Sequence, residues 1–449
     1  MPSILITNAR VVSDGREFDA DVRIEGERIG LIGDSLAAKP GERVIDARGA
    51  WLMPGMIDDQ VHFRDPGLTH KGDTATESAA AVAGGTTSFM DMPNTRPPTL
   101  DHAALEAKYA NAAGRAHANY GFYFGASNDN LEAIRGLDPR ATPGVKVFMG
   151  ASTGNMLVDD PDVLDGIFRD SPVTIITHCE DTPTIDANLA GYVAQYGNDI
   201  PVRFHPDIRS REACLKSSRL AVELARRHDS RLHVLHISTA DELDLFERGP
   251  LIRANGSRKR ITAETCVHFL HFTRADYDRL GNLIKCNPAI KDASDRDALI
   301  RALADDVIDV LATDHAPHTW EEKQQQDYLK APGGLPLTQF ALQCALERVH
   351  DGLLTRAQVV QKTAHATAQL FDVVDRGFVR EGQFADLVLI EDAPYTVRRE
   401  AVLSKCGWSP FEGTTFRSRI ASTWVNGRQV WDGTSVIGPA DGQRLQFHR

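Results

Sequence analysis

Histidine, aspartate and lysine residues stand in or directly after several apolar runs of this 449-residue chain: His62, Lys146, His178, His236 and Asp314. Imidazole nitrogens and a carboxylate oxygen brought together from separate strand ends can bind one metal site, and this donor set suits zinc. Any one of these histidines could instead be an ordinary core or surface residue. Their repeated position at the ends of apolar runs favours a shared metal site.

Lys146 lies inside the apolar run 144–149, where a charged amine is costly to bury. One interpretation is a buried ion pair, or a side chain that reaches the surface. The other is an amine of lowered pKa that CO2 carbamylates, which would give a carboxylate able to bridge two metals. The residues alone leave both interpretations open.

The runs that would position these residues alternate with helical stretches in the middle of the chain. We expect strands at 87–92, 144–149, 173–177, 232–237 and 307–313, and helices at 103–113, 219–228 and 294–303. Near-continuous apolar strands that alternate with helices are typical of a parallel sheet buried on both faces. Over residues 54–377 a (β/α)8 barrel fits better than an open sheet, and in both folds the carboxyl ends of the strands carry the chemistry.

Both ends of the chain have a different pattern, with short alternating segments separated by turns. We expect antiparallel strands at 4–6, 9–12, 21–24, 29–32, 385–390 and 422–427. These segments predict a small β-sandwich domain built from residues 1–53 and 378–449, beside a barrel domain of residues 54–377.

Composition excludes several classes of partner. The chain has 50 Lys and Arg against 62 Asp and Glu, a net charge of −12, which argues against nucleic acid. We find no signal peptide and no stretch near the ~20 apolar residues that span a bilayer. Six scattered cysteines without a C-x-x-C motif indicate free thiols in a reducing cytoplasm. We therefore expect a cytoplasmic protein without membrane or nucleic-acid partners.

Several short motifs together resemble the amidohydrolase superfamily and, within it, the dihydroorotases. They cover nearly the whole chain: 61–67 (VHFRDPG), 92–95 (MPNT), 177–180 (THCE), 233–239 (HVLHIST), 287–288 (NP) and 312–318 (ATDHAPH). The resemblance implies a distorted (β/α)8 TIM barrel. It also implies reversible, zinc-dependent hydrolysis of L-dihydroorotate to N-carbamoyl-L-aspartate in pyrimidine biosynthesis, by a homodimer.

The resemblance also implies metal ligands. His62 would bind the more buried of two zinc ions, His178 and His236 would bind the more exposed ion, and carbamylated Lys146 (N6-carboxylysine) would bridge both. Asp314 would bind the buried ion and serve as the catalytic base and acid.

Substrate contacts follow from the same resemblance. Arg64, Asn94 and His318 would hold the substrate carboxylate, and Asn287 would hydrogen-bond the dihydropyrimidine ring. The backbone of 333–336 would also contact the ring. The segment 150–155 is either a movable lid or a plain surface turn.

Position 60 departs from the family pattern, because the usual His-x-His motif is Gln60-Val61-His62 here. Strand alternation places Gln60 and His62 on one face, yet an amide oxygen is a weaker zinc donor than imidazole. Gln60 could coordinate weakly or not at all, the buried site could be empty so that one zinc remains, or the chain could be a non-catalytic relative. The retained ligand set favours an active enzyme with one or two zinc ions.

Two further functions stay open. The chain could be a dihydropyrimidinase, hydantoinase or allantoinase, whose rings lack the free carboxylate that Arg64, Asn94 and His318 would bind. It could also be a non-catalytic subunit in complex with a carbamoyltransferase.

Four other residues have weaker signals. His315 follows Asp314 on the same loop and is expected to make a local hydrogen bond, while His268 could line the pocket. His233 points away from the ligand positions and is expected to be structural, and Cys179 is expected to pack in the core.

Overall fold

A computed structural model describes residues 3–150 and 156–449. Apart from Gly150, the predicted lid or turn at 150–155 lies outside the described residues.

The middle of the chain forms short parallel strands, each buried along nearly its whole length. They are β6 (Met56–Val61), β7 (Thr86–Asp91), β8 (Asn119–Phe122), β9 (Phe124–Gly125), β10 (Gly144–Phe148), β11 (Thr174–His178), β12 (Leu232–Val234), β13 (Ile261–Cys266) and β14 (Val310–Ala312). They pair in the order β6-β7-β8 and β9-β10-β11-β12-β13-β14. Only Tyr123 separates β8 from β9. A parallel bridge between Val61 and His315 joins the end of the series to its beginning, so the predicted α/β barrel is confirmed.

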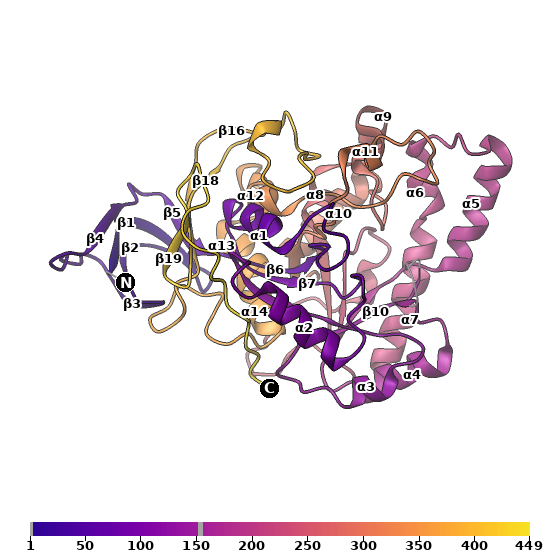
Figure 1. The fold of residues 1–449 in the computed structure, drawn as a ribbon, viewed down its shortest axis with the longest axis horizontal. Helices are drawn as coiled ribbons and strands as arrows, with labels where there is room; N and C mark the ends of the chain where they lie inside the picture. Colours follow the sequence, from indigo (N-terminus) through magenta and orange to yellow (C-terminus); the bar gives the residue numbers. More distant parts are fainter. Residues whose placement is uncertain (1–2, 151–155) are drawn as a thin grey trace.

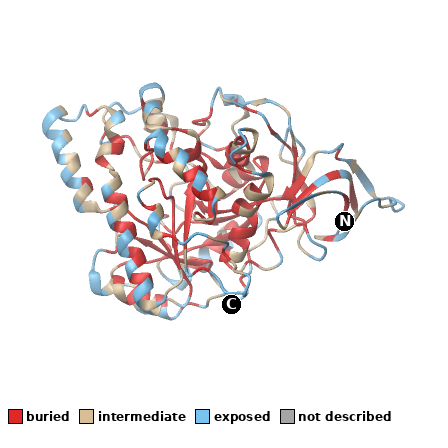
Figure 2. Cartoon of the chain, turned by 180° about the vertical axis from the view of Figure 1, so that it is seen from behind, coloured by how far each residue is buried: buried red, intermediate tan, exposed pale blue. Residues whose placement is uncertain are grey.

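Helices follow most of these strands and cover the barrel (Figure 1). The longer ones are α1 (Thr74–Ala83), α2 (His102–Ala112), α4 (Pro161–Asp170), α5 (Thr182–Tyr196), α7 (Arg211–His228), α10 (Ala293–Ala304) and α12 (Ala341–His350). Shorter ones are α3 (Leu131–Arg135), α6 (His205–Ile208), α8 (Val267–His271), α9 (Tyr277–Leu280), α11 (Trp320–Lys323), α13 (Arg356–Val360) and α14 (Ala366–Leu370). The strands are buried and the outward helix faces are exposed (Figure 2).

Helix starts are fixed by side chains at their first positions. Asp73 accepts hydrogen bonds from the backbone amides of Ala75 and Thr76 at the start of α1, and Ser210 accepts one from Ala213 at the start of α7. Such caps satisfy backbone donors that have no partner inside the helix.

Strands from both chain ends form one eight-stranded sheet, ordered β19-β18-β15-β5-β1-β2-β3 with β4 also on β1. Its members are β1 (Ile4–Ser13), β2 (Arg16–Glu25), β3 (Arg28–Gly33), β4 (Arg43–Asp46), β5 (Trp51–Pro54), β15 (Leu387–Glu391), β18 (Arg419–Val425) and β19 (Arg428–Trp431). The strands expected at 4–6 and 9–12 are one strand with a register shift at that point, where Asn8 has a φ of 54°.

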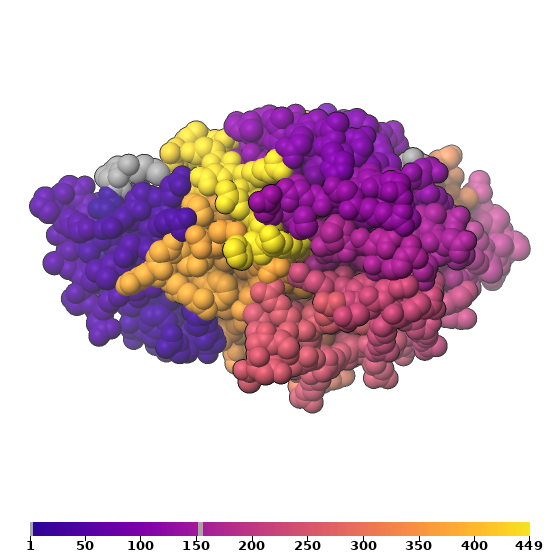
Figure 3. Space-filling model, turned by 90° about the horizontal axis from the view of Figure 1, so that it is seen from below, coloured from indigo at the N-terminus to yellow at the C-terminus, as the bar shows by residue number. Residues whose placement is uncertain are grey.

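This sheet encloses its own core, which includes Ile6, Val11, Leu52, Leu387 and Trp424. A two-stranded ribbon of β16 (Tyr395–Thr396) and β17 (Thr415–Phe416) follows β15. Figure 3 shows the yellow C-terminal residues lying between the indigo N-terminal sheet and the purple part of the barrel. The boundaries after residues 53 and 377 stay a prediction.

Two expectations from composition can be compared with the structure. All six cysteines are buried and unpaired: Cys179, Cys214, Cys266, Cys286, Cys344 and Cys406. Among the described residues, no helix is both long enough and apolar enough to cross a bilayer.

Candidate active site

A cavity of about 300 Å³ lies at the carboxyl ends of the barrel strands. All ten residues that the sequence indicated for the site line it: Gln60, His62, Arg64, Asn94, Lys146, His178, His236, Asn287, Asp314 and His318. Gly333 and Gly334, from the segment expected to contact the ring, also line it. The sequence did not indicate the remaining lining residues, Phe148, Ala316 and Pro332. A larger hollow of about 620 Å³ near Asp199 and Tyr328 contains no histidine, so it offers no comparable set of donors.

The strands position these side chains in two ways. Lys146 is central in β10 and His178 ends β11, which pairs with β10 in parallel. His236 and Asp314 instead lie two residues beyond the ends of β12 and β14, with φ values of 40° and 51°. Such left-handed backbone is uncommon for residues other than glycine, and here it occurs at three residues that line the cavity, since Arg64 has a φ of 68°.

His178 and His236 form one pair of candidate ligands. Nδ1 of His178 lies 2.9 Å from Nε2 of His236, and the rings are nearly perpendicular. Burial lowers the pKa of both imidazoles, that of His236 well below its usual range, so both are held in the neutral form that binds metals. The carboxylate of Glu180 lies 3.1 Å from Nε2 of His178, and Arg209 pairs with that carboxylate.

His62 and Asp314 form a second pair. Nε2 of His62 lies 3.2 Å from Oδ1 of Asp314, and its Nδ1 lies 2.8 Å from the amide oxygen of Asn94. A hydrogen bond that fixes one ring nitrogen orients the other toward a metal. Gln60 donates from Nε2 to the same Asp314 oxygen over 3.1 Å.

Lys146 is buried and lines the same cavity as these two pairs. Burial lowers the pKa of its amine to about 8. Its Nζ lies 4.7 Å from the centre of the Phe148 ring, and no carboxylate of the described residues forms an ion pair with it. The structure therefore does not support the interpretation of Lys146 as one half of a buried ion pair.

These donors fit a divalent metal. Two neutral imidazoles, a third imidazole beside a carboxylate, and an amine whose lowered pKa favours carbamylation together provide nitrogen and oxygen ligands of the kind zinc takes.

A cationic group lines the opposite part of the cavity. Nη2 of Arg64 lies 3.1 Å from Nε2 of His318, and its Nε donates to the carbonyl of Pro317 over 3.1 Å. Burial, followed by the charge of Arg64, lowers the pKa of His318 to about 3, so this imidazole is neutral.

Lys71 and Glu322 support this group, and the sequence gave no signal for either residue. Nζ of Lys71 donates to Nδ1 of His318 over 3.1 Å and pairs with Glu322 at 2.8 Å. Because Glu322 is engaged by Lys71, Arg64 has no carboxylate partner among the described residues.

Glycines let the loop 333–336 approach the site. A Cβ on Gly333 would lie 2.9 Å from the amide nitrogen of Asn287, and one on Gly334, whose φ is 143°, would lie 2.5 Å from the carbonyl oxygen of Ala316. The amide oxygen of Asn287 is buried without a hydrogen-bond partner, so it is available to a ligand in the cavity.

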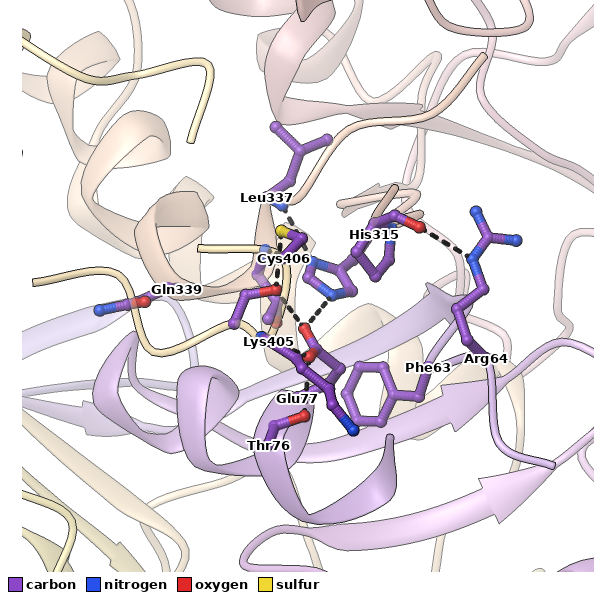
Figure 4. Close-up of polar contacts among 12 residues, drawn as sticks. Phe63, Arg64, Thr76, Glu77, His315, Leu337, Gln339, Lys405 and Cys406 are labelled. Carbon is purple, nitrogen blue, oxygen red and sulfur yellow. Dashed lines mark hydrogen bonds and ion pairs between the residues drawn. The ribbon is translucent and has the colours of Figure 1, made fainter. Parts of the chain in front are cut away.

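His315 has a structural role behind the site (Figure 4). Its Nδ1 accepts hydrogen bonds from the backbone amides of Leu337 and Thr338, so Nε2 carries the proton and donates to Glu77 over 2.9 Å. Its carbonyl accepts from the amide of His62. The hydrogen bond between His315 and Glu77 joins residues that lie far apart in the sequence, whereas we expected a local one. It connects α1 to the end of β14.

The remaining histidines lie outside the cavity lining. His268, which the sequence left as a residue that could line the pocket, is buried and does not line the cavity. His233 is fully buried beside Asp59 and Glu264. Cys179 is buried, and burial raises the pKa of its thiol to about 11, which suits a core residue.

The fold and the cavity define an α/β-barrel protein with a candidate metal centre at its strand ends. Residues 51–430 match the amidohydrolase family, and the chain belongs to this family.

Relatives and solved structures share nearly its whole length. A dihydroorotase of Halobacterium salinarum is 34% identical over 445 residues, 97% of this chain and 98% of that protein. An allantoinase of Bacillus velezensis is 30% identical over 433 residues, 95% of this chain and 94% of that protein. The structure of an L-hydantoinase from Arthrobacter aurescens matches with a TM-score of 0.92 and 27% identity, covering 99% of this chain and 100% of that one.

Proposed function

We propose that this chain is a zinc-dependent dihydroorotase, which opens the ring of L-dihydroorotate to N-carbamoyl-L-aspartate and also closes it. We further propose that it acts in pyrimidine biosynthesis, as a cytoplasmic homodimer. Its similarity to the archaeal dihydroorotase supports this choice, but similarity to an allantoinase is nearly as strong, so the choice depends on the cavity.

The observation that most supports this choice is the environment of Arg64. Its guanidinium lines the cavity, and burial lowers its pKa from the usual value, which means that the charge is poorly solvated. A desolvated cation is costly unless an anion compensates it. Glu322 is taken by Lys71, so a ligand with a carboxylate is the natural partner, and a guanidinium binds a carboxylate through two hydrogen bonds.

The other residues have roles that agree with this ligand. Asn94 and neutral His318 would add hydrogen bonds to the carboxylate, and the free amide oxygen of Asn287 would accept one from a ring N–H. Lys146 as its carbamate, with His62, His178, His236 and Asp314, would hold the metal. The bound metal would supply an activated water and polarise the amide carbonyl.

Asp314 is the group placed to move a proton. Its carboxylate lines the cavity and lies between His62 and Gln60. It would take the proton from the attacking water and pass it to the ring nitrogen as the C–N bond breaks, and the reverse path would close the ring.

Ring-opening assays test the proposal. The purified, zinc-loaded protein should have a kcat/KM for L-dihydroorotate at least about 100-fold above those for dihydrouracil, hydantoin and allantoin, because a site built for a polar group rejects ligands that lack it. A preference for an uncharged ring would overturn the assignment.

The second candidate is hydrolysis of an uncharged ring, as the names of the allantoinase and the L-hydantoinase suggest. The hydrogen bond from Nε of Arg64 to the carbonyl of Pro317 favours it, because part of the guanidinium is already bound within the chain. Under this candidate, replacing Arg64 would leave turnover of the uncharged ring unchanged.

The third candidate, a non-catalytic subunit, is favoured by the hydrogen bond that occupies Asp314. It predicts a protein without zinc in the cavity that forms a complex with a carbamoyltransferase. Elemental analysis of the purified protein separates it from the two enzymes.

A further inference from the structure

Three buried ionisable side chains meet in the barrel interior, outside the cavity described above. Asp59 comes from β6, His233 from β12 and Glu264 from β13, and each is fully buried. One potential ligand atom from each lies within 4.8 Å of the others. None of the three lines the active-site cavity.

Four polar atoms of this group form no hydrogen bond, although they lie next to one another. Both carboxylate oxygens of Asp59, Oε2 of Glu264 and Nε2 of His233 are buried without a hydrogen bond. A buried polar group in this state costs about 1–3 kcal/mol, and more when it is charged. Four such atoms facing one another require either protons or a cation between them.

The imidazole of His233 is already oriented as a ligand. The hydroxyl of Thr262 donates to the carbonyl of Leu232 over 3.1 Å, so it must accept the hydrogen bond from Nδ1 of His233, 2.8 Å away. In the neutral ring this leaves a lone pair on Nε2, directed at two carboxylates. A hydrogen bond from the far nitrogen is the usual support of a metal-binding histidine.

The net charge of the three side chains is also consistent with a bound cation. Two carboxylates, a neutral imidazole and a divalent cation sum to a charge of zero. Without a cation the group holds protons instead, because burial and the charge of Asp59 raise the pKa of Glu264 to about 8. Burial lowers the pKa of His233, but its contacts with Asp59 and Glu264 outweigh burial and raise that pKa to about 9. The ring of Phe371, part of a buried apolar cluster, lies against the group, with its centre 5.9 Å from that of His233. An uncompensated charge is expensive in such surroundings.

The spacing fits a small cation. Nε2 of His233 lies 3.3 Å from Oδ2 of Asp59 and 3.6 Å from Oε2 of Glu264. Ligands of a tetrahedral zinc with bonds of roughly 2.0–2.2 Å lie about 3.3–3.6 Å apart.

We propose that Asp59, His233 and Glu264 bind a divalent cation of the zinc or manganese class inside the barrel, separately from the active-site metals. The site supports the active site from below, because Oε1 of Glu264 accepts a hydrogen bond from the backbone amide of His236 over 3.3 Å. The three side chains are closed off from solvent, so the cation is taken up as the chain folds.

Two measurements test the proposal on the full-length protein. Protein from zinc-supplemented cultures is dialysed against pyridine-2,6-dicarboxylate, which reaches the open cavity, and its metal is counted by plasma mass spectrometry. About one equivalent should remain in the wild type and none in Asp59→Asn, as expected for a closed three-ligand site. Asp58→Asn is the matched control, because the neighbouring buried Asp58 is instead engaged by Thr313, and it should keep the equivalent.

The second measurement needs no variant. Anomalous scattering at the zinc edge from crystals of the dialysed wild type should show a peak at bonding distance from Nε2 of His233. No peak there, with no residual metal, would mean that protons alone neutralise the group and would overturn the proposal. Turnover of dihydroorotate reports separately on the proposed function, since residual metal can persist whether or not the cavity is active.

Discussion

The side-chain amide of Gln60 donates a hydrogen bond to Oδ1 of Asp314 over 3.1 Å, and this is the oxygen that lies 3.2 Å from Nε2 of His62. This oxygen therefore accepts a hydrogen bond from the uncharged amide of Gln60, at the position where the family pattern has a second histidine. A metal at His62 and Asp314 would have to compete with that amide, while a metal at His178 and His236 would have to replace the contact between their two rings.

We expect Gln60→His to raise the zinc content of the protein by about one equivalent, because imidazole is a stronger zinc ligand than an amide. Metal content after equilibration with buffered zinc is the measurement. Gln60→Met, which has no comparable donor, is the control and should stay at the wild-type value. Unchanged content in Gln60→His would show that position 60 is not a ligand.

Arg64→Gln should lower kcat/KM for L-dihydroorotate by at least about 30-fold, since a hydrogen bond to a charged group contributes roughly 1.5–3 kcal/mol. Steady-state assays with L-dihydroorotate and dihydrouracil measure the effect, and only the first substrate should be affected. Arg140→Gln, at a surface ion pair with Asp138, is the control. Equal losses on both substrates would argue against a carboxylate contact.

Lys146→Arg should lose cavity zinc affinity by more than about 100-fold, because even supporting partners of metal ligands cost about 10–100-fold. Arginine keeps the positive charge but cannot form the carbamate, so this variant separates charge from carbamylation. Competition with a zinc-binding dye gives the affinity. If the variant bound zinc like the wild type, the bridging role of Lys146 would be wrong.

His268 should make the fold sensitive to mild acid. Burial lowers the pKa of its imidazole to about 4. Below pH 6.5 the unfolded chain therefore binds a proton at His268 that the folded chain does not bind, and the free energy of unfolding falls as the pH drops. Between pH 6.5 and 5 this amounts to about 2 kcal/mol.

Urea unfolding at pH 7 and pH 5 measures this loss. His268→Phe should reduce the difference between the two pH values by about 2 kcal/mol, whereas His70→Gln, at an exposed histidine, should not change it. An unchanged difference in His268→Phe would refute the assignment.

Glu77→Gln should lower the free energy of unfolding by about 2 kcal/mol, because it weakens the charged hydrogen bond to His315. The same carboxylate also accepts from the hydroxyl of Ser404 and the amide of Lys405. Urea unfolding at pH 7 is the measurement, with Glu132→Gln on the surface as control. Equal stability of the two variants would mean that the buried contact contributes little.

The sequence predicted the barrel and the five polar residues at its strand ends because both depend on periodicity. Four other cavity residues were indicated only by the resemblance to the amidohydrolases: Arg64, Asn94, Asn287 and His318. Apolar runs mark buried strands, and polar residues at their ends must meet at one edge of a parallel sheet. It extended two strands too far, however. Of the runs 232–237 and 307–313, only Leu232–Val234 and Val310–Ala312 are strands, and the backbone is left-handed shortly after each of them, at His236 and Asp314.

Contacts between residues on loops far apart in the sequence could not be predicted from such a pattern. Lys71 reaches His318 across 247 positions, and nothing in the local pattern around either residue indicates the contact. The group of Asp59, His233 and Glu264 was missed for a related reason. Strand alternation assigned His233 away from the ligand positions, and only the three-dimensional structure shows what it meets there.

The pairing of β5 with β15 also has a consequence for synthesis of the chain. Leu52 and its partner Leu389 are separated by most of the polypeptide. During synthesis, the edge of β5 that pairs with β15 therefore has no partner strand until almost all of the chain has left the ribosome. Non-local pairing of this kind slows folding, and an exposed strand edge attracts other chains. Nascent chains that end before β15 should therefore need chaperones more than the finished protein does.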